Sequence, residues 1–124
     1  TTVQEDIYMR AEEDSLTLGM LSYTYQPNIE ESNMKEAVDT ACREHRLVHF
    51  HASDNHRGKP ISGHIDFDAL FSVLATSNYR GHIVMEIFAP GGLDAPWTQS
   101  IMDPDVRASS GLAFLSNLMK RHRL

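Results

Sequence analysis

Residues 47–88 read LVHFHASDNHRGKPISGHIDFDALFSVLATSNYRGHIVMEIF. Two short apolar runs of strand composition, 47–52 and 83–88, stand on either side of a polar loop and a helical pattern. The helical pattern follows Asp66, a residue suited to cap the first turn of a helix. This order predicts a βαβ unit, in which two parallel strands are joined through a helix.

Outside this segment the sequence predicts one further strand and three further helices. Before residue 47 we expect a helix over 3–14, a strand over 16–23, a loop over 28–33 and a second helix, whose apolar face is Met34, Ala37, Val38, Ala41 and Cys42. After residue 88 we expect a loop over 89–103 and a last helix that begins at Pro104. The whole chain is therefore predicted to be α/β, with about three parallel strands and four helices.

Size and composition narrow the class of protein. The chain has 124 residues, which predicts a single domain over 1–124, and its 41% hydrophobic and 23% charged residues are typical of a soluble globular protein. The formal net charge of −6 argues against a nucleic-acid partner, because binding phosphates needs clustered Lys and Arg. No apolar run reaches the roughly 20 residues of a membrane span, so no membrane partner is expected.

Two further features bear on the origin and location of the chain. The single cysteine, Cys42, excludes an internal disulfide and favours a reducing compartment, and no signal-peptide pattern is present, so we expect a cytoplasmic protein. The chain opens on Thr1 without an initiator Met, which suggests a processed or excised segment.

Functional groups of open parallel sheets lie past the carboxyl ends of the strands. Tyr23, His51 and Glu86 occupy this position on the three expected strands. Glu86 is the one charged residue in an apolar run, and burying it alone is costly, so we expect it to meet a cation, a hydrogen-bond donor or a metal ion. The alternation of the first run also places His49 on the same face as His51.

Five segments carry a resemblance to a known family. They are HFHASDNHR (49–57), GKP (58–60), GHIDF (63–67), YRG (79–81) and VME (84–86), with NIEE (28–31) upstream and, weakly, MDPDVR (102–107) downstream. Together they resemble the D-tagatose and D-psicose 3-epimerases of the xylose isomerase-like TIM-barrel superfamily. Since a full barrel takes roughly 250 residues, the resemblance implies the carboxyl-terminal half of a TIM barrel.

The resemblance implies a divalent metal, Mn²⁺, Co²⁺ or Mg²⁺, held by Glu, Asp, His and Glu from four successive strands. His51 matches the metal histidine. Glu86 matches the last metal carboxylate, which also serves as one of the two catalytic groups that exchange the proton at C3 of the sugar. Arg57 matches an arginine that binds substrate oxygens.

This sequence departs from the family pattern at the other positions. Tyr23 stands where the family has its metal Asp, and Gln26 stands where the family has a substrate-binding His. The first metal Glu is expected upstream of Thr1. The metal site of this chain is therefore expected to be incomplete, because two ligands fall short of the usual three or four.

Structural interpretations of the same residues remain open. His51 and His49 can each be a core histidine that is hydrogen-bonded to a neighbour, and Glu86 can be a buried carboxylate paired with Arg57. Arg57 can also be a solvated cation of the loop. Asp54 and Asn55 can be turn residues that bond their own backbone, and Trp97 can anchor its loop in place of stacking on a sugar.

Two functions follow. The first is that of a sugar isomerase or epimerase, acting at C3 of a ketose in the parent family and incomplete as this isolated chain, with a sugar or sugar phosphate as its partner. The second is that of a non-catalytic half-barrel that binds sugar or mediates oligomerisation. The open edges of a three-stranded sheet predict a homo-oligomer in either case. A third class, the DNA-repair endonucleases of the superfamily, is disfavoured by the acidic charge and the sparse metal-ligand set.

Overall fold

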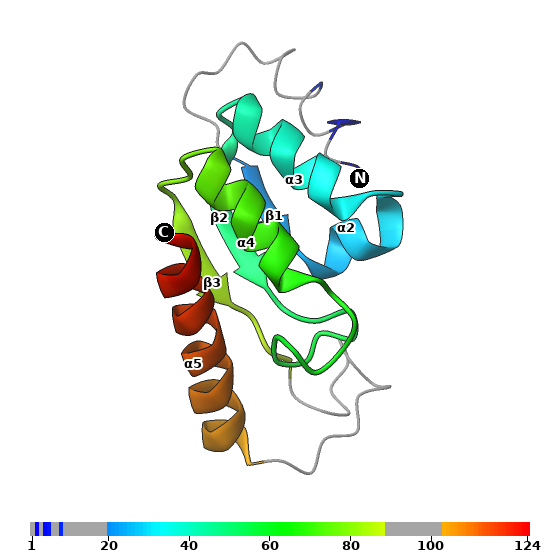
Figure 1. Ribbon diagram of the computed structural model, residues 1–124. Coiled ribbons are helices and arrows are strands. Elements are labelled where there is room, and N and C mark those ends of the chain that lie inside the picture. The colour runs from blue at the N-terminus through cyan, green and yellow to red at the C-terminus, as the bar shows by residue number, and fades with distance from the viewer. Residues whose placement is uncertain (1, 3, 6–7, 9–19, 89–102) are drawn as a thin grey trace.

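The computed structural model describes residues 2, 4–5, 8, 20–88 and 103–124 (Figure 1). Its strands and helices are, in chain order, β1 (Met20–Tyr23), α2 (Tyr25–Glu30), α3 (Met34–Arg43), β2 (Leu47–Ala52), α4 (Phe67–Thr76), β3 (His82–Met85) and α5 (Pro104–His122). The strands form one sheet in the order β1-β2-β3, and both neighbouring pairs are parallel. The expected α/β class with three parallel strands is confirmed.

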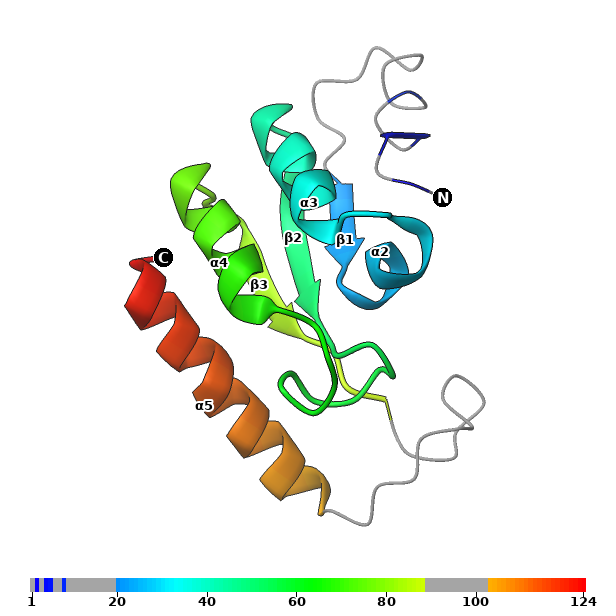
Figure 2. The same ribbon diagram turned by 45° about the vertical axis from the view of Figure 1, so that its right-hand side comes forward.

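Helices lie on one side of the sheet. α3 and α4 run in front of it in Figure 1, and α5 runs alongside α4 at the β3 side (Figure 2). The carboxyl ends of all three strands point to the same end of the molecule, where α2 and the loop 53–66 also lie. Any site at the strand ends is therefore built from α2, this loop and the residues that follow β3.

The core lies between α3, α4 and the sheet. α3 begins at the cap residue Asn33, whose side chain accepts a hydrogen bond from the N–H of Glu36 at 3.2 Å. Phe50 of β2 is fully buried and meets the edge of Phe71 from α4 at a ring-centroid distance of 6.2 Å. The apolar spacing predicts all the buried residues of the two helices, namely Ala37, Val38, Ala41 and Cys42 of α3 and Phe67, Leu70, Phe71, Val73 and Leu74 of α4. Met34, the remaining member of the predicted face of α3, is only partly buried against this core.

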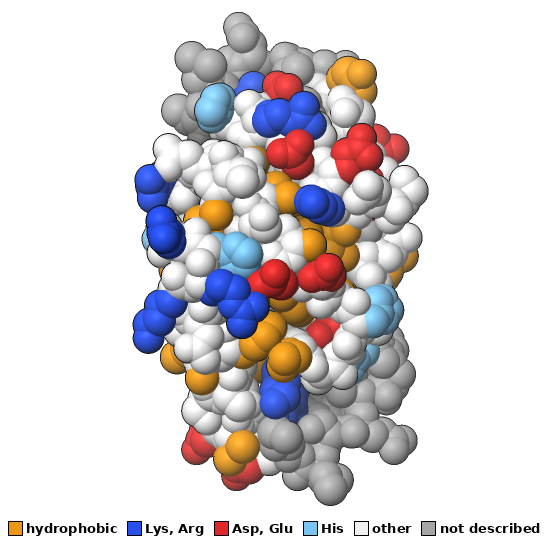
Figure 3. Space-filling view, viewed as in Figure 1, with side chains coloured by type: hydrophobic (Ala, Val, Ile, Leu, Met, Phe, Trp, Pro, Cys, Tyr) orange, Lys and Arg blue, Asp and Glu red, His pale blue; other side chains and the backbone are white. Residues whose placement is uncertain are grey.

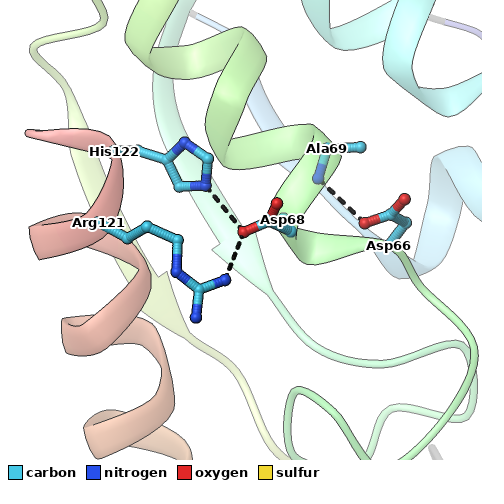
Figure 4. A network of polar contacts seen from close by, with 5 residues as sticks. All are labelled: Asp66, Asp68, Ala69, Arg121 and His122. Atoms are coloured by element: carbon cyan, nitrogen blue, oxygen red, sulfur yellow. Dashed lines mark hydrogen bonds and ion pairs between the residues drawn. The ribbon is translucent and has the colours of Figure 1, made fainter.

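Helix α4 is capped and tied to α5 by acidic residues. The carboxylate of Asp66 accepts a hydrogen bond from the N–H of Ala69 at 3.0 Å, which confirms the predicted cap. Asp68 reaches Arg121 of α5 at 2.8 Å and His122 at 3.0 Å (Figure 4). The two helices are thus joined at the exposed rim of their contact.

Helix α5 starts as the sequence predicts. Pro104 occupies its first turn, and the side chain of Asp103 accepts the N–H of Asp105 at 2.8 Å. Gly111 faces β3, because a Cβ at this position would overlap the sulfur of Met85. The absence of a side chain at residue 111 lets the helix approach the strand closely.

Two expected boundaries are wrong. The loop expected over 28–33 begins inside α2, because this helix extends to Glu30. Pro27 is compatible with α2 because it lies in the first turn, where its missing N–H needs no acceptor. β3 ends at Met85 although a strand to Phe88 is expected, since the N–H of Phe88 turns away to the carbonyl of Arg57 at 3.1 Å. The helix expected over 3–14 falls mostly outside the described residues, as do residues 16–19 and 89–102.

The surface and the helices add two observations. Basic side chains lie along the left of the face shown in Figure 3, and acidic side chains lie mainly at its upper right and centre. In the part of the chain that the structure describes, none of the helices combines the length and apolar character that a membrane crossing requires.

Candidate functional site

The register of the sheet brings the three expected positions together. Tyr23 of β1 pairs with His51 of β2, and His51 pairs with Val84 of β3, two residues before Glu86. Backbone hydrogen bonds continue the ladder past the strands, from the N–H of Thr24 to His51 and from the N–H of Glu86 to Ala52. The backbone of all three positions therefore lies at one edge; the side chains of Tyr23 and Gln26 are outside the described set.

His51 and Glu86 face each other across this edge. His51 Nδ1 lies 3.6 Å from Glu86 Oε2, and the two side chains are 16% and 27% exposed. Glu86 thus meets a potential cation, as expected. The ion pair that the structure gives Glu86 is with His51, whereas the guanidinium of Arg57 lies against two aromatic rings.

The pair has a geometry that suits a shared metal ion. Protein nitrogen and oxygen ligands bind ions such as Zn²⁺ at about 2.0–2.2 Å, so atoms 3.6 Å apart can both reach one ion. Among the residues that the structure describes, however, no group of three or more His, Cys, Asp and Glu side chains is placed to hold a metal. Two ligands do not form a complete catalytic metal site, so the described part of the chain does not fit a resident metal on its own.

A row of histidines extends from His51 along the same face of the sheet. The ring of His49 stacks on that of His82 at 4.8 Å and lies 6.0 Å from that of His51. His49 Nδ1 is buried, and no residue of the described ranges forms a hydrogen bond with it. The expected hydrogen bond of a core histidine is therefore not formed at Nδ1 of His49, and the register partner of His49 in β3 is a second imidazole, that of His82.

The loop 53–66 closes around a buried carboxylate. Asp54 is 0% exposed, and its Oδ1 accepts the N–H groups of Asn55 at 2.9 Å and Ile65 at 3.2 Å. Asn55 Oδ1 accepts the N–H of His64 at 3.0 Å. These contacts confirm the interpretation of Asp54 and Asn55 as residues that bond the backbone of their own loop.

The same loop is tied to three neighbouring elements. His64 contacts Asn28 of α2 at 3.1 Å, Lys59 donates to Ser110 of α5 at 3.3 Å, and the carbonyl of Arg57 accepts the N–H of Phe88 at 3.1 Å. At the strand end, Thr24 and Ser53 bond reciprocally through the hydroxyl of Thr24. The loop therefore has a defined position relative to the strand ends.

Arg57 lies in this loop with its side chain between two elements. Its Cζ atom is 4.5 Å from the ring centroid of Tyr25 in α2 and 4.6 Å from that of Phe88, which follows β3. The carbonyl of Phe88 accepts a hydrogen bond at 2.9 Å from Nη2 of Arg107, a buried residue of α5. Arg57 is thus a packed cation, and its interpretation as a solvated loop charge is wrong.

The sequence does not single out Tyr25, Phe88 or Arg107 as site residues. A partial signal exists, because Tyr25 and Phe88 each follow an expected site residue, Tyr23 and Glu86, at a distance of two positions. Arg107 carries no such signal. Trp97, a candidate for stacking on a sugar, lies outside the described residues.

Known proteins resemble this chain in sequence and in fold. Residues 8–118 match the family model of the xylose isomerase-like TIM barrel. The chain is 45% identical over 62 residues to 3-dehydro-D-guloside 4-epimerase of Escherichia coli (strain K12), a match that covers 50% of this chain and 23% of that protein. It is 33% identical over 99 residues to L-ribulose 3-epimerase of Methylomonas sp. (strain DH-1), covering 74% of this chain and 34% of that protein.

Solved structures give the same picture. An L-ribulose 3-epimerase structure matches with a TM-score of 0.88 over 98% of this chain and 43% of its own, and its 24% identity makes it evidence for the fold alone. A D-psicose 3-epimerase crystallised in the presence of D-fructose matches with a TM-score of 0.84 and 26% identity, over 95% of this chain and 44% of its own. The fold is therefore that of a partial TIM barrel, and the chain spans less than half the length of each of these relatives.

Proposed function

Because the chain belongs to the xylose isomerase-like TIM barrel family, we propose that it forms part of a sugar epimerase whose site lies at the carboxyl ends of β1, β2 and β3. The observation that carries the proposal is the 3.6 Å approach of His51 Nδ1 to Glu86 Oε2 at these ends. The relatives support it, since they include epimerases of L-ribulose and D-psicose.

The proposed substrate is a ketose or related keto-sugar, free or phosphorylated. Epimerisation at C3 removes a proton next to the C2 carbonyl and returns one to the opposite face. Glu86 is proposed as the catalytic group on one face, where its partly exposed carboxylate can take up the C3 proton. Arg57 is proposed to donate hydrogen bonds to substrate oxygens, and Gln26 to bind a sugar hydroxyl.

The proposed cofactor is Mn²⁺, Co²⁺ or Mg²⁺, with His51 and Glu86 as two of its ligands. When bound, such an ion stabilises negative charge that develops on substrate oxygens. Tyr23 takes the place of a hard carboxylate ligand, which weakens binding by this chain alone. We therefore propose that residues beyond the described ones complete the site.

We also propose that residues 1–124 form the carboxyl-terminal half of a barrel and act as one domain that associates with further copies. The cytoplasm is the proposed location, supported by the use of a single cysteine, Cys42, which is free and buried. A non-catalytic sugar-binding half-barrel is the second candidate, and the observation that favours it is the presence of Tyr23 and Gln26 at the positions of Asp and His.

The experiment that tests the proposal is thermal unfolding with and without Mn²⁺ or Co²⁺. A ligand that binds only the native state raises the melting temperature, so if His51 and Glu86 still hold a metal ion, the ion raises the melting temperature of this chain and His51→Ala abolishes the rise. His45→Asn is the matched control, because His45 is exposed at the opposite end of β2 and adopts a φ of 52°, which Asn tolerates. Equal melting with metal and with chelator would contradict the metal role, and stabilisation by D-psicose alone would favour the non-catalytic candidate.

A further inference from the structure

The guanidinium of Arg57 is held by rings from two elements that are distant in sequence. Tyr25 belongs to the start of α2 and Phe88 to the segment after β3, and the Arg57 Cζ atom lies 4.5 Å and 4.6 Å from their ring centroids. A guanidinium is planar and stacks on aromatic faces while its N–H groups point outward in the plane. Because the two rings come from different elements, their contacts with Cζ together restrict where the guanidinium can lie.

The backbone of Arg57 is fixed as well. Its φ of 58° is left-handed, a conformation that few residues other than glycine adopt. Two hydrogen bonds hold it there, from its own N–H to the carbonyl of Asp54 at 2.9 Å and from the N–H of Phe88 to its carbonyl at 3.1 Å. The side chain therefore starts from a defined direction before the rings contact it.

Phe88 is in turn held from α5. Its N–H bonds to Arg57, and its carbonyl accepts Nη2 of Arg107 at 2.9 Å. Arg107 is only 6% exposed, so this charged residue is buried in the interior of the protein. A chain of contacts thus runs from α5 through Phe88 to the loop cation and on to α2.

We propose that Tyr25, Phe88 and Arg107 are positioning residues that keep the N–H edge of Arg57 oriented toward the oxygens of the sugar. This inference rests on the proposed function, in which Arg57 binds substrate. A long, flexible side chain that is ordered before binding loses less freedom when the ligand arrives, which increases affinity. Phe88 acts through Arg57 and does not itself bind the sugar.

The first test is the NMR signal of the Arg57 Nε–Hε group, assigned by its loss in Arg57→Lys. Proximity to two rings gives this group an upfield ring-current shift, which Phe88→Leu and Tyr25→Leu reduce and Tyr25→Phe preserves. Phe114→Leu is the matched control. The ring of Phe114 packs on that of Phe67 at 6.0 Å, whereas the described ring contacts of Arg57 are with Tyr25 and Phe88. An Arg57 signal that is unchanged in both Leu variants would overturn the inference.

The second test is a double-mutant cycle on the Kd for D-psicose or D-fructose, titrated into the full chain. We expect Phe88→Leu to weaken binding about tenfold in the native chain and to have no further effect in the Arg57→Lys background. Independent, additive losses would show that Phe88 binds the sugar directly and would overturn the inference. A native chain that binds no sugar overturns the proposed function, whereas the NMR signal still decides whether the rings fix Arg57.

Discussion

Asp54 and Gly63 show how single residues shape the loop beside the candidate site. Asp54 is fully enclosed and bonds two N–H groups of its own loop. A Cβ at residue 63 would overlap the side-chain oxygens of both Asn55 and Asp54. Glycine is required here because the backbone passes directly over these oxygens, so the path of the loop depends on the absence of one methyl group.

Gly63→Ala is expected to destabilise the protein by about 1–3 kcal/mol, as overpacking of a filled interior does. The overlap forces Asn55 and Asp54 away from the N–H groups that they accept. The measurement is urea unfolding, with Lys35→Ala as control, since Lys35 is an exposed residue of α3, outside the loop. An unchanged midpoint in Gly63→Ala would show that the loop adapts without loss.

At the scale of elements, stability arises from contacts between helices and strands that are too short to persist alone. α3 and α4 have 10 residues each, which is below the length at which an isolated helix is stable in water. Burial of Phe50 against Phe71 joins α4 to the sheet, and the contact of Asp68 with Arg121 and His122 joins α4 to α5. The second contact is exposed and electrostatic, so it depends on pH.

Asp68→Asn is expected to lower the melting temperature slightly at pH 7. His122 and Arg121 hold the pKa of the Asp68 carboxyl below its ordinary value of 3.8, because both stabilise the charged form. A pKa that is lower in the folded state than in the unfolded state stabilises the protein at pH values above the ordinary pKa. This stabilisation is lost as the pH falls through the lowered pKa. The effect is small because the pair is exposed.

The measurement is the melting temperature of both proteins from pH 7 down to about pH 2, below the unperturbed carboxyl pKa. The difference between them should close at the acidic end. Asp66→Asn is the control, since Asn retains the helix cap while it removes a neighbouring carboxylate. A difference that persists at low pH would show that the side chain acts through packing and not through its charge.

At the scale of the molecule, the sheet has two outer strands in the part of the chain that the structure describes. β1 and β3 each pair on one side only, and the described helices leave one face of the sheet uncovered. Unpaired strand edges favour association. The proposed epimerisation also needs a second acid or base on the opposite face of the sugar from Glu86.

We expect the purified chain to sediment as a homodimer or larger oligomer at micromolar concentration and to form no C3 epimer from D-fructose, D-tagatose or D-psicose with Mn²⁺ or Co²⁺. Association follows from the open edges, and inactivity follows from the single assigned carboxylate and from Tyr23 at a ligand position. A monodisperse monomer near 14.0 kDa would contradict the first expectation. Epimer formation that Glu86→Gln removes would contradict the second and would point to a second acid or base from a neighbouring subunit.

Much of the fold could be predicted because its signals are local. The alternation of 47–52 determines which side chains share a face, the spacing of apolar residues determines the buried sides of α3 and α4, and Asp66 and Pro104 determine where α4 and α5 begin. The order of strands and helices along the chain then brings the backbone of Tyr23, His51 and Glu86 to one edge. The helices and strands depend on residues within a few positions of one another, and parallel strands joined through helices have their carboxyl ends at one edge, which is why the sequence determined these features.

The contacts within the site were decided only by the tertiary structure. Whether Glu86 meets His51 or Arg57, whether His49 finds a hydrogen-bond partner or the ring of His82, and which rings hold Arg57 all depend on strand register and on the path of the loop 53–66. Each of these contacts joins residues from different elements, and many pairings are compatible with the same local patterns. Burial of the shared core selects one register, and that selection places the side chains.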